Sequence, residues 1–424
     1  MKKNLYATAL TVCSLVSAAS AQEARLAPVV DAPVAVRRCG SMEVLERQLA
    51  ADPSLAQRLG AVESHTRAYE AKPAAQRTAA VVTIPVVVHV VYRTAAENVP
   101  TSQINEQIAV LNRYFAKLNS DANKVPSAFA SLAANTNIQF VLAKRTPTGA
   151  ATTGIIRKQT TVTSWSDNDA VKRSSSGGDN AWPASQYLNL WLCNLGGGLL
   201  GYAQFPGGPA STDGVVVLYS SVPGGTSTNY NKGRTATHEV GHWLNLRHIW
   251  GDANCGNDLV ADTPTQQTDN GGCPSFPHRT CGNTTSGDMF MNYMDYTYDA
   301  CMYMFTNGQS TRMNALFASG GSRASLRSSL GGTAPRAATV AGVAADAEAI
   351  ALYPNPASHS LNVAVPADKA SAYSVKVYDL RGREMKQAAY DGRGRVAVSA
   401  LPQGLYQVVI SDGEHTTRQG FQKD

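Results

Sequence analysis

The chain has 424 residues, of which 37 are Lys or Arg and 31 are Asp or Glu, so its formal net charge is +6. At about 150 residues per domain, this length predicts two or three folded units. The positive charges form no concentrated basic block, so no nucleic-acid partner is indicated.

The amino terminus has the pattern of an export signal. Lys2 and Lys3 precede an apolar run over residues 5–16, and small residues at positions 19–21 form a cleavage site. We therefore predict a signal peptide over residues 1–21. The apolar run is shorter than the ~20 residues that a membrane span requires, and no later segment could cross a bilayer, so we predict no transmembrane span.

The next segment, residues 22–76, is rich in Ala and Arg and poor in large apolar residues. Its helical periodicity near residues 42–59 predicts a helix that packs poorly alone. At residues 81–92 a nearly continuous β-branched run predicts a buried central strand. A helix with one apolar side is predicted over residues 102–118. Further strands are expected at residues 138–143, 187–193 and 214–219, which together indicate a mixed, twisted α/β (α+β) sheet.

The run HEVGHWLNLRH, which begins at His238, has the spacing of a catalytic zinc site. On a helix His238 and His242 lie one turn apart on the same face, with Glu239 beside them. His248 can join them only if the helix ends and the chain turns back, and Asn245 tolerates the positive φ that such a turn needs. Three neutral imidazoles leave one tetrahedral zinc position for water.

The carboxy-terminal third changes in composition. After a short helix predicted at residues 309–317, residues 318–347 are rich in Gly, Ser and Ala and lack aromatic residues, which predicts a linker. Residues 348–424 contain short alternating segments separated by turn signals, which predict a small, immunoglobulin-like all-β sandwich. Its strands are expected at residues 360–365, 374–378, 395–398 and 405–410.

Several motifs together resemble the metzincin metallopeptidases and, within them, the pappalysin family. Besides the zinc motif, these are GGLLGYAQFP at residues 197–206, NYMDY at residues 292–296 and DACMYMF at residues 299–305. The resemblance covers roughly residues 83–317. It implies a metzincin catalytic domain, residues 77–317, that hydrolyses peptide bonds in protein substrates.

The resemblance also implies residue roles. The three histidines of the zinc motif would bind Zn²⁺, and Glu239 would be the general base that activates the attacking water. Tyr296 matches the family tyrosine that stabilises the tetrahedral intermediate, and Met294 matches the Met-turn residue. Asp299 matches the acidic residue of the pocket for the side chain just after the scissile bond, which implies a preference for Arg or Lys there. The alternative for Asp299 is a solvated surface carboxylate.

Four cysteines cluster after the zinc motif. In an exported chain such a cluster is expected to form disulfides, although the sequence alone allows three pairings. The resemblance implies the pairs Cys255–Cys281 and Cys273–Cys301.

Between these cysteines, the segment NDLVADT at residues 257–263 resembles the calcium loop of the family. Asp258 and Thr263 would be Ca²⁺ ligands together with backbone carbonyls, since this cation prefers oxygen ligands. The alternative is an ordinary acidic turn.

Cys39 lies in the run RRCG, within the segment 22–76. The resemblance implies that this segment is a propeptide and that Cys39 is a cysteine switch, whose thiolate takes the fourth zinc position in a latent precursor. The alternative is a disulfide with Cys193. The predicted strand that ends at Cys193 favours the switch, because it would bury that thiol as a small hydrophobe. A preference for Arg or Lys after the cut would allow self-cleavage before Arg77.

The segment 348–424 resembles the sorting domain of the type IX secretion system. The motifs are LYPNP at residues 352–356, VYDLRGR at residues 377–383 and LPQGLY at residues 401–406. The resemblance implies that the type IX secretion machinery is a partner and that the protein is secreted or attached to the cell surface. The alternative is a carbohydrate- or protein-binding sandwich, which a cluster of exposed aromatic residues would mark.

Two functions follow from the sequence: a secreted zinc endopeptidase, or a catalytically inactive adhesin or binding protein on the same scaffold. Inactive relatives typically lose the glutamate or one of the zinc ligands. This chain keeps all of them, which favours the enzyme.

Overall fold

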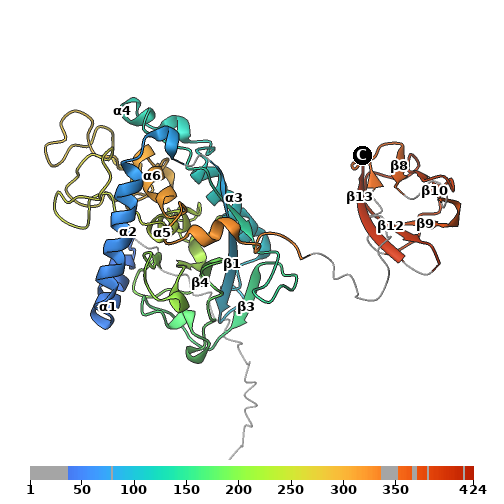
Figure 1. Ribbon diagram of the computed structural model, residues 1–424, viewed down its shortest axis with the longest axis horizontal. Helices are drawn as coiled ribbons and strands as arrows, with labels where there is room; N and C mark the ends of the chain where they lie inside the picture. The colour runs from blue at the N-terminus through green and yellow to red at the C-terminus, as the bar shows by residue number, and fades with distance from the viewer. Residues whose placement is uncertain (1–36, 78–79, 336–351, 365–369, 380–381, 414–415) are drawn as a thin grey trace, which may run out of the picture. The chain divides into compact units, whose positions relative to one another are not determined.

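The computed structural model describes the chain except for residues 1–36, 78–79, 336–351, 365–369, 380–381 and 414–415, so the predicted signal peptide lies outside the described residues. The chain divides into two compact units, Met1–Arg336 and Ala337–Asp424 (Figure 1). Within the described ranges, no helix is both long and apolar enough to cross a membrane.

The larger unit is built on a six-stranded mixed sheet around the long strand β1 (Val82–Tyr92). The other strands are β2 (Ile138–Leu142), β3 (Ile155–Gln159), β4 (Leu188–Cys193), β5 (Gly201–Ala203) and β6 (Val215–Leu218). Strand β1 pairs in parallel with β2, β3 and β4, and β6 pairs in parallel with β4. Strand β5 closes the sheet as an antiparallel edge next to β6. The β-branched residues of β1 are almost all buried, as expected for a central strand.

Apolar clusters cover both faces of this sheet. Helices α3 (Thr101–Phe115) and α5 (Arg234–Trp243) lie on one face, where apolar residues of α3 such as Leu111 pack against alternate residues of β1. A second cluster around Trp191 and Tyr202 covers the opposite face. The predicted mixed α/β sheet is therefore confirmed. A short helix, α4, spans Ser127–Ala130, and single 3₁₀ turns occupy Ala122–Lys124, Ala170–Lys172, Ser174–Ser176, Ala210–Thr212, Tyr219–Ser221 and Asp299–Cys301.

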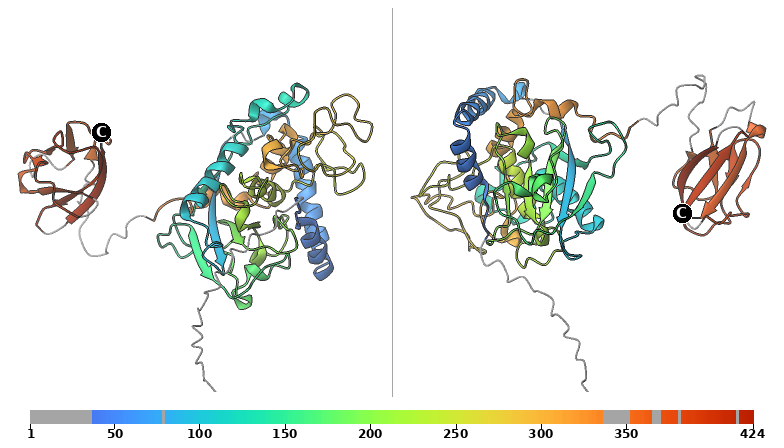
Figure 2. Two further views of the ribbon diagram at one scale, coloured as in Figure 1. Left: turned by 180° about the vertical axis from the view of Figure 1, so that it is seen from behind. Right: turned by 90° about the horizontal axis from the view of Figure 1, so that it is seen from below.

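Two helices that precede the sheet, α1 (Ser41–Ala51) and α2 (Leu55–Glu70), run along one side of the larger unit (Figure 2). The single helix predicted near residues 42–59 is thus two helices. They are separated at Pro53, because a proline ring crowds the preceding turn of a helix and offers no N–H. Helix α2 packs against α6 (Asn307–Ala315). A 3₁₀ turn at Ala74–Gln76 then leads to β1.

The linker prediction is wrong for the described residues 318–335, which belong to the larger unit. They include a 3₁₀ helix at Ala324–Ser328. Leu326 is buried in the main core, and Arg323 forms a salt bridge of 3.0 Å with Asp213. Composition suggested a linker because few of these residues are apolar, but the ion pair, the buried leucine and hydrogen bonds such as that from Ser329 Oγ to the Gln186 carbonyl attach the segment.

The smaller unit consists of two antiparallel sheets. One has the strand order β10-β11-β8-β7 and the other β13-β12-β9, and the two enclose one apolar cluster. The predicted all-β domain is therefore confirmed. The strands are β7 (Leu352–Tyr353), β8 (Ser360–Val363), β9 (Ser374–Asp379), β10 (Ala389–Tyr390), β11 (Arg395–Ala397), β12 (Gly404–Ser411) and β13 (Thr416–Lys423).

Candidate active site

Helix α5 and the turn that follows it bring the three histidines together. The helix ends at Trp243, and the chain turns back through Asn245, whose φ is 70°. Asparagine tolerates this left-handed conformation better than most residues, so the turn forms without glycine. His248 then returns to the face of α5 that carries His238 and His242.

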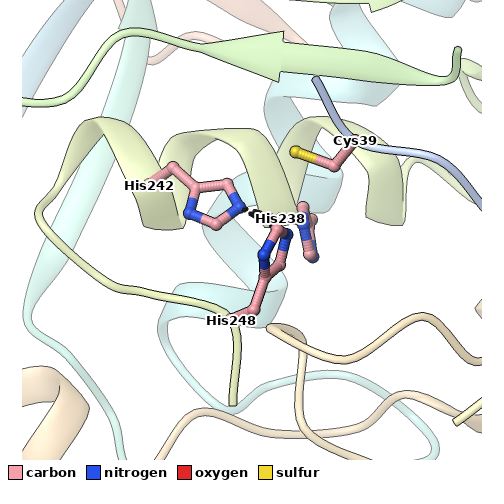
Figure 3. A group of neighbouring side chains, drawn as sticks. All are labelled: Cys39, His238, His242 and His248. Carbon is pink, nitrogen blue, oxygen red and sulfur yellow. Dashed lines mark hydrogen bonds between the residues drawn. The ribbon is translucent and has the colours of Figure 1, made fainter. Parts of the chain in front are cut away.

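The side chains of the three histidines converge on one point (Figure 3). The Nε2 atom of His242 lies 3.1 Å from the Nε2 atoms of both His238 and His248. The Cys39 Sγ atom joins this group, in which all donor atoms lie within 4.8 Å of one another and all four residues are buried. Three imidazoles and a thiol in this arrangement are a ligand set suited to tetrahedral zinc.

Each imidazole is oriented by a hydrogen bond that its Nδ1–H donates. The acceptors are the carbonyl oxygens of Tyr293 and Leu246, at 2.7 and 2.8 Å, and a carboxylate oxygen of Asp252, at 2.5 Å from His248. These bonds fix the tautomer that leaves Nε2 free to bind a metal. Burial lowers the pKa of His238 and His242 well below the usual histidine value, which keeps both rings neutral.

Met294 lies directly beneath α5. It is fully buried, and a Cβ atom at Gly241 would collide with its sulfur, so glycine at this position allows the helix to rest on the methionine. The backbone N–H of Met294 donates to Asn292 Oδ1 at 2.9 Å, and its carbonyl accepts from Ile249 at 3.2 Å. The turn thus supports both the helix and the chain that carries the third histidine.

Glu239 points towards the same group. Its Oε2 atom accepts hydrogen bonds from Cys39 Sγ at 3.3 Å and from Ser41 Oγ at 3.1 Å. A Cβ atom at Gly201 would lie 2.7 Å from Glu239 Oε1, so glycine in β5 leaves room for the carboxyl group. Burial raises the pKa of Glu239 to about 8, so its carboxylate is a stronger base than that of an ordinary glutamate.

Tyr296 closes the other side of the site. Its ring packs against His238, His248 and Trp250, with centroids 4.8–5.7 Å apart. Its hydroxyl oxygen accepts a hydrogen bond from the Cys39 N–H at 3.3 Å. Burial raises the pKa of Tyr296, so the hydroxyl stays protonated and can donate to a nearby oxygen.

The segment around Cys39 lies in the site as an added strand, parallel to β5. Gly40 N–H donates to the Gly201 carbonyl at 2.9 Å, and Leu200 N–H donates to the Arg38 carbonyl at 2.9 Å. The segment therefore occupies the exposed edge of the sheet, where an extended peptide could otherwise pair.

Asp299 is buried and paired, which contradicts the alternative of a solvated carboxylate. Its Oδ1 atom lies 2.6 Å from Arg37 Nη2, and both side chains are 1% exposed. Its Oδ2 atom accepts hydrogen bonds from the backbone N–H groups of Lys232 and Arg234, at 2.8 and 3.4 Å. Arg37 also lies over the ring of Tyr230, 5.1 Å from its centroid.

The candidate calcium loop contains Asp258 and Thr263, which contact each other. Asp258 is 4% exposed, and both of its carboxylate oxygens lie 2.9 Å from Thr263 Oγ1. The same hydroxyl lies 2.9 Å from the carbonyl of Val260. Burial raises the pKa of Asp258 to about 7.

The structure contains the disulfides Cys255–Cys281 and Cys273–Cys301. Among the described residues, Cys39 and Cys193 are the free thiols, and both are buried. The alternative Cys39–Cys193 disulfide is therefore absent from this structure.

Arg37, Ser41 and Asp252 contact the site, although the sequence did not single them out. Arg37 lies in the same short motif as Cys39, so its position in the sequence could have marked it as a site residue. Asp252 follows His248 by four residues and offered only its spacing. Ser41 gave no signal, because its role depends on Glu239, which is far away in the sequence.

The sheet, the helix with two histidines, the turn to a third histidine and the methionine beneath them define a metzincin-type metallopeptidase. The family model described as pregnancy-associated plasma protein-A matches residues 172–318. An extracellular metalloprotease of Arthroderma benhamiae is 34% identical over 284 residues, which are 65% of this chain and 91% of that protein. The chain belongs to the pappalysin family of metalloendopeptidases.

Solved structures of mirolysin are also similar. A promirolysin variant of Tannerella forsythia is 47% identical, with a TM-score of 0.65, and the match covers 71% of this chain and all of that one. Mature T. forsythia mirolysin in complex with a cleaved peptide is 53% identical, with a TM-score of 0.58, over 59% of this chain and 97% of that one.

A second family model, the secretion system C-terminal sorting domain, matches residues 351–422. The smaller unit is therefore a sorting domain of the type IX kind predicted from the sequence. Together with the extracellular relatives, it identifies the protein as an exported enzyme, secreted or attached to the cell surface.

Asp252 gives a test of the hydrogen bonds that orient the histidines. We expect Asp252→Ala to lower zinc affinity by roughly 10–100-fold, because His248 loses the acceptor that fixes its orientation. Competition with a zinc chelator measures the change. Asp269→Ala is the matched control, since Asp269 accepts a hydrogen bond from the neighbouring Thr268 hydroxyl and not from a histidine of the cluster. Equal affinity in both variants would contradict the role of Asp252.

Proposed function

We propose that this metalloendopeptidase holds zinc through His238, His242 and His248 and cleaves peptide bonds that precede Arg or Lys, with Glu239 as the general base. One observation carries this proposal. A segment of the chain itself lies along the edge of the sheet with a guanidinium group paired to Asp299 at 2.6 Å, beside the histidine cluster. An arginine or lysine of a substrate would find the same buried carboxylate.

The protein groups around the cluster suit hydrolysis. Zinc held by the three histidines would act as a Lewis acid and would lower the pKa of a bound water to about 7. Glu239 accepts the proton of the attacking water and passes it to the leaving amine. The Tyr296 hydroxyl donates to the oxygen on which negative charge develops. Glu239 and Tyr296 both contact Cys39 in this structure, which supports their position at the reacting atoms once that residue leaves.

Glu239→Ala tests the general base. We expect the processed variant to lose on the order of 10²–10⁴-fold in kcat, because no other carboxylate replaces the proton acceptor. Zinc content should stay at the wild-type level, which elemental analysis checks. Glu106→Ala, at an exposed position on α3, is the control. Wild-type peptide cleavage by Glu239→Ala would exclude the proposed mechanism.

We propose further that the segment before residue 77 keeps the precursor latent, with Cys39 in the remaining metal position. Its support is the grouping of Cys39 Sγ with the three histidines, and the similarity to a structure named promirolysin. The backbone of the segment runs parallel to β5. A substrate with its scissile bond at the same point and its basic side chain at Asp299 would have to run the opposite way.

Cys39→Ala tests latency. We expect the uncleaved variant precursor to hydrolyse a peptide substrate, while the wild-type precursor does not, because the thiol no longer fills the metal position. Cys193→Ala removes the other buried free thiol and should leave the precursor latent. A Cys39→Ala precursor as latent as the wild type would count against the switch.

Asp299→Asn tests specificity. The amide keeps the shape and an acceptor oxygen but loses the charge. We expect kcat/KM for peptides with Arg after the scissile bond to fall by roughly 10–100-fold, the usual effect of losing a charged hydrogen bond. Peptides with Ala at that position should change much less. An equal fall for both peptide series would point to a structural defect instead, because Asp299 also binds two backbone N–H groups.

We propose a Ca²⁺ site at Asp258, Thr263 and the carbonyl of Val260. The support is a buried carboxylate next to a hydroxyl and a carbonyl oxygen, the ligand types that calcium prefers. We expect added calcium to raise the Tm of the zinc-loaded protein, and Asp258→Ala to abolish this increase. Asp262→Ala is the control, because Asp262 instead accepts from the first residues of α6. A calcium-dependent Tm that survives in Asp258→Ala would exclude this site.

A further inference from the structure

The segment before residue 77 contacts the rest of the larger unit along much of its length, and two groups of these contacts contain buried ion pairs. The first is the active site, where Arg37, Cys39 and Ser41 bind. The second is α6, against which helix α2 packs (Figures 1 and 2). The proposed latency uses only the first.

The second contact is centred on Arg312 of α6, whose side chain is 1% exposed. Its Nη1 and Nη2 atoms donate to the two carboxylate oxygens of Glu63 at 3.2 and 2.8 Å. Glu70, two turns beyond on α2, lies 3.7 Å from the same guanidinium group. Arg312 also donates to the carbonyl of Leu259 at 3.2 Å, so its position is fixed from the enzyme side.

Two further contacts extend this interface along α2. The His65 Nε2 atom lies 3.0 Å from the Ala315 carbonyl oxygen, which is within hydrogen-bonding distance. Tyr69 is 3% exposed and forms a small apolar cluster with Ala315 and Ala318. The second contact therefore combines an ion pair with two hydrogen bonds, a hydrogen bond from a side chain to a backbone carbonyl, and an aromatic side chain packed against alanines.

Residues 71–76, which follow α2, are all exposed and give an accessible place for a cut. The 3₁₀ turn Ala74–Gln76 has no buried residue, and the residues that the segment contributes to the two contacts all precede this turn. A cut there removes the covalent link but none of the contacts. Two contacts on one segment reinforce each other, because the one that stays bound keeps the other at a high effective concentration.

We infer that the face of α6 around Arg312 is a second docking site for the segment before residue 77. This site keeps the segment bound after the chain is cut, so cutting alone does not activate the enzyme. The partner is this chain's own helix α2, and the recognised chemistry is a helix that presents a carboxylate and, six residues later, a tyrosine. Activation then takes two steps, cleavage and release. This inference rests on the proposed latency of the precursor.

A time course of processing tests the inference. The full-length precursor is cut by a trace of processed enzyme, and each sample is divided between a denaturing gel and an assay with a peptide substrate. We expect activity to lag behind cleavage in the wild type. Glu63→Gln removes the charge that pairs with Arg312 without altering α6, and should shorten the lag by at least about tenfold. Glu46→Gln, the same change at an exposed position of α1, should leave the lag unchanged.

Binding in trans gives a second measurement that does not depend on folding of the variant precursor. A synthetic peptide of residues 37–76 is added to the processed enzyme as an inhibitor. We expect Glu63→Gln or Tyr69→Ala in this peptide to weaken inhibition by at least about tenfold, and Glu46→Gln to have no effect.

Activity that rises in step with cleavage in the wild type would overturn the inference, as would a lag unaffected by Glu63→Gln. Failure of the latency proposal looks different, because an uncut wild-type precursor would then be active. A peptide of residues 37–54, which lacks α2, separates the two sites: it should inhibit more weakly than residues 37–76, and equal inhibition would also overturn the second docking site.

Discussion

The active site depends on the burial of three imidazoles, each of which donates a hydrogen bond from Nδ1–H. Two of the acceptors are backbone carbonyls, one in the turn after α5 and one in the methionine turn, so the path of the main chain sets the direction of the rings. Because the rings are held before a metal binds, little side-chain freedom remains to be lost on binding. Gly241 and Gly201 belong to the same constraint, since each leaves room for a group that the site requires.

The segment before residue 77 contacts features that the proposed function assigns to substrate binding and catalysis: the edge of β5, the Asp299 carboxylate and the side chains of Glu239 and Tyr296. Latency and specificity are therefore proposed from one set of contacts. The docking of α2 on α6 adds a part that no substrate needs to share. Because of this docking, the affinity of the segment for the enzyme can change without a change in the contacts that the segment makes in the active site.

Much of the fold followed from local patterns. The β-branched run, the amphipathic helix and the alternating segments of the smaller unit predicted the elements, because burial imposes its period directly on the residues. The linker prediction was wrong over residues 318–335, where Arg323 and Leu326 attach a segment of linker-like composition. Strand β5 was missed, because three residues in a glycine-containing edge carry too little pattern.

The sequence by itself determined the chemistry of the protein: three histidines and a glutamate at fixed spacing, a methionine turn and a sorting domain are local motifs, and the comparisons with known proteins place the chain in the family these motifs indicated. Only the tertiary structure decided which distant groups meet. Arg37 reaches Asp299, Ser41 reaches Glu239 and Glu63 reaches Arg312 across long separations in sequence. Such pairs leave no periodic signal, because the fold of the whole chain brings them together.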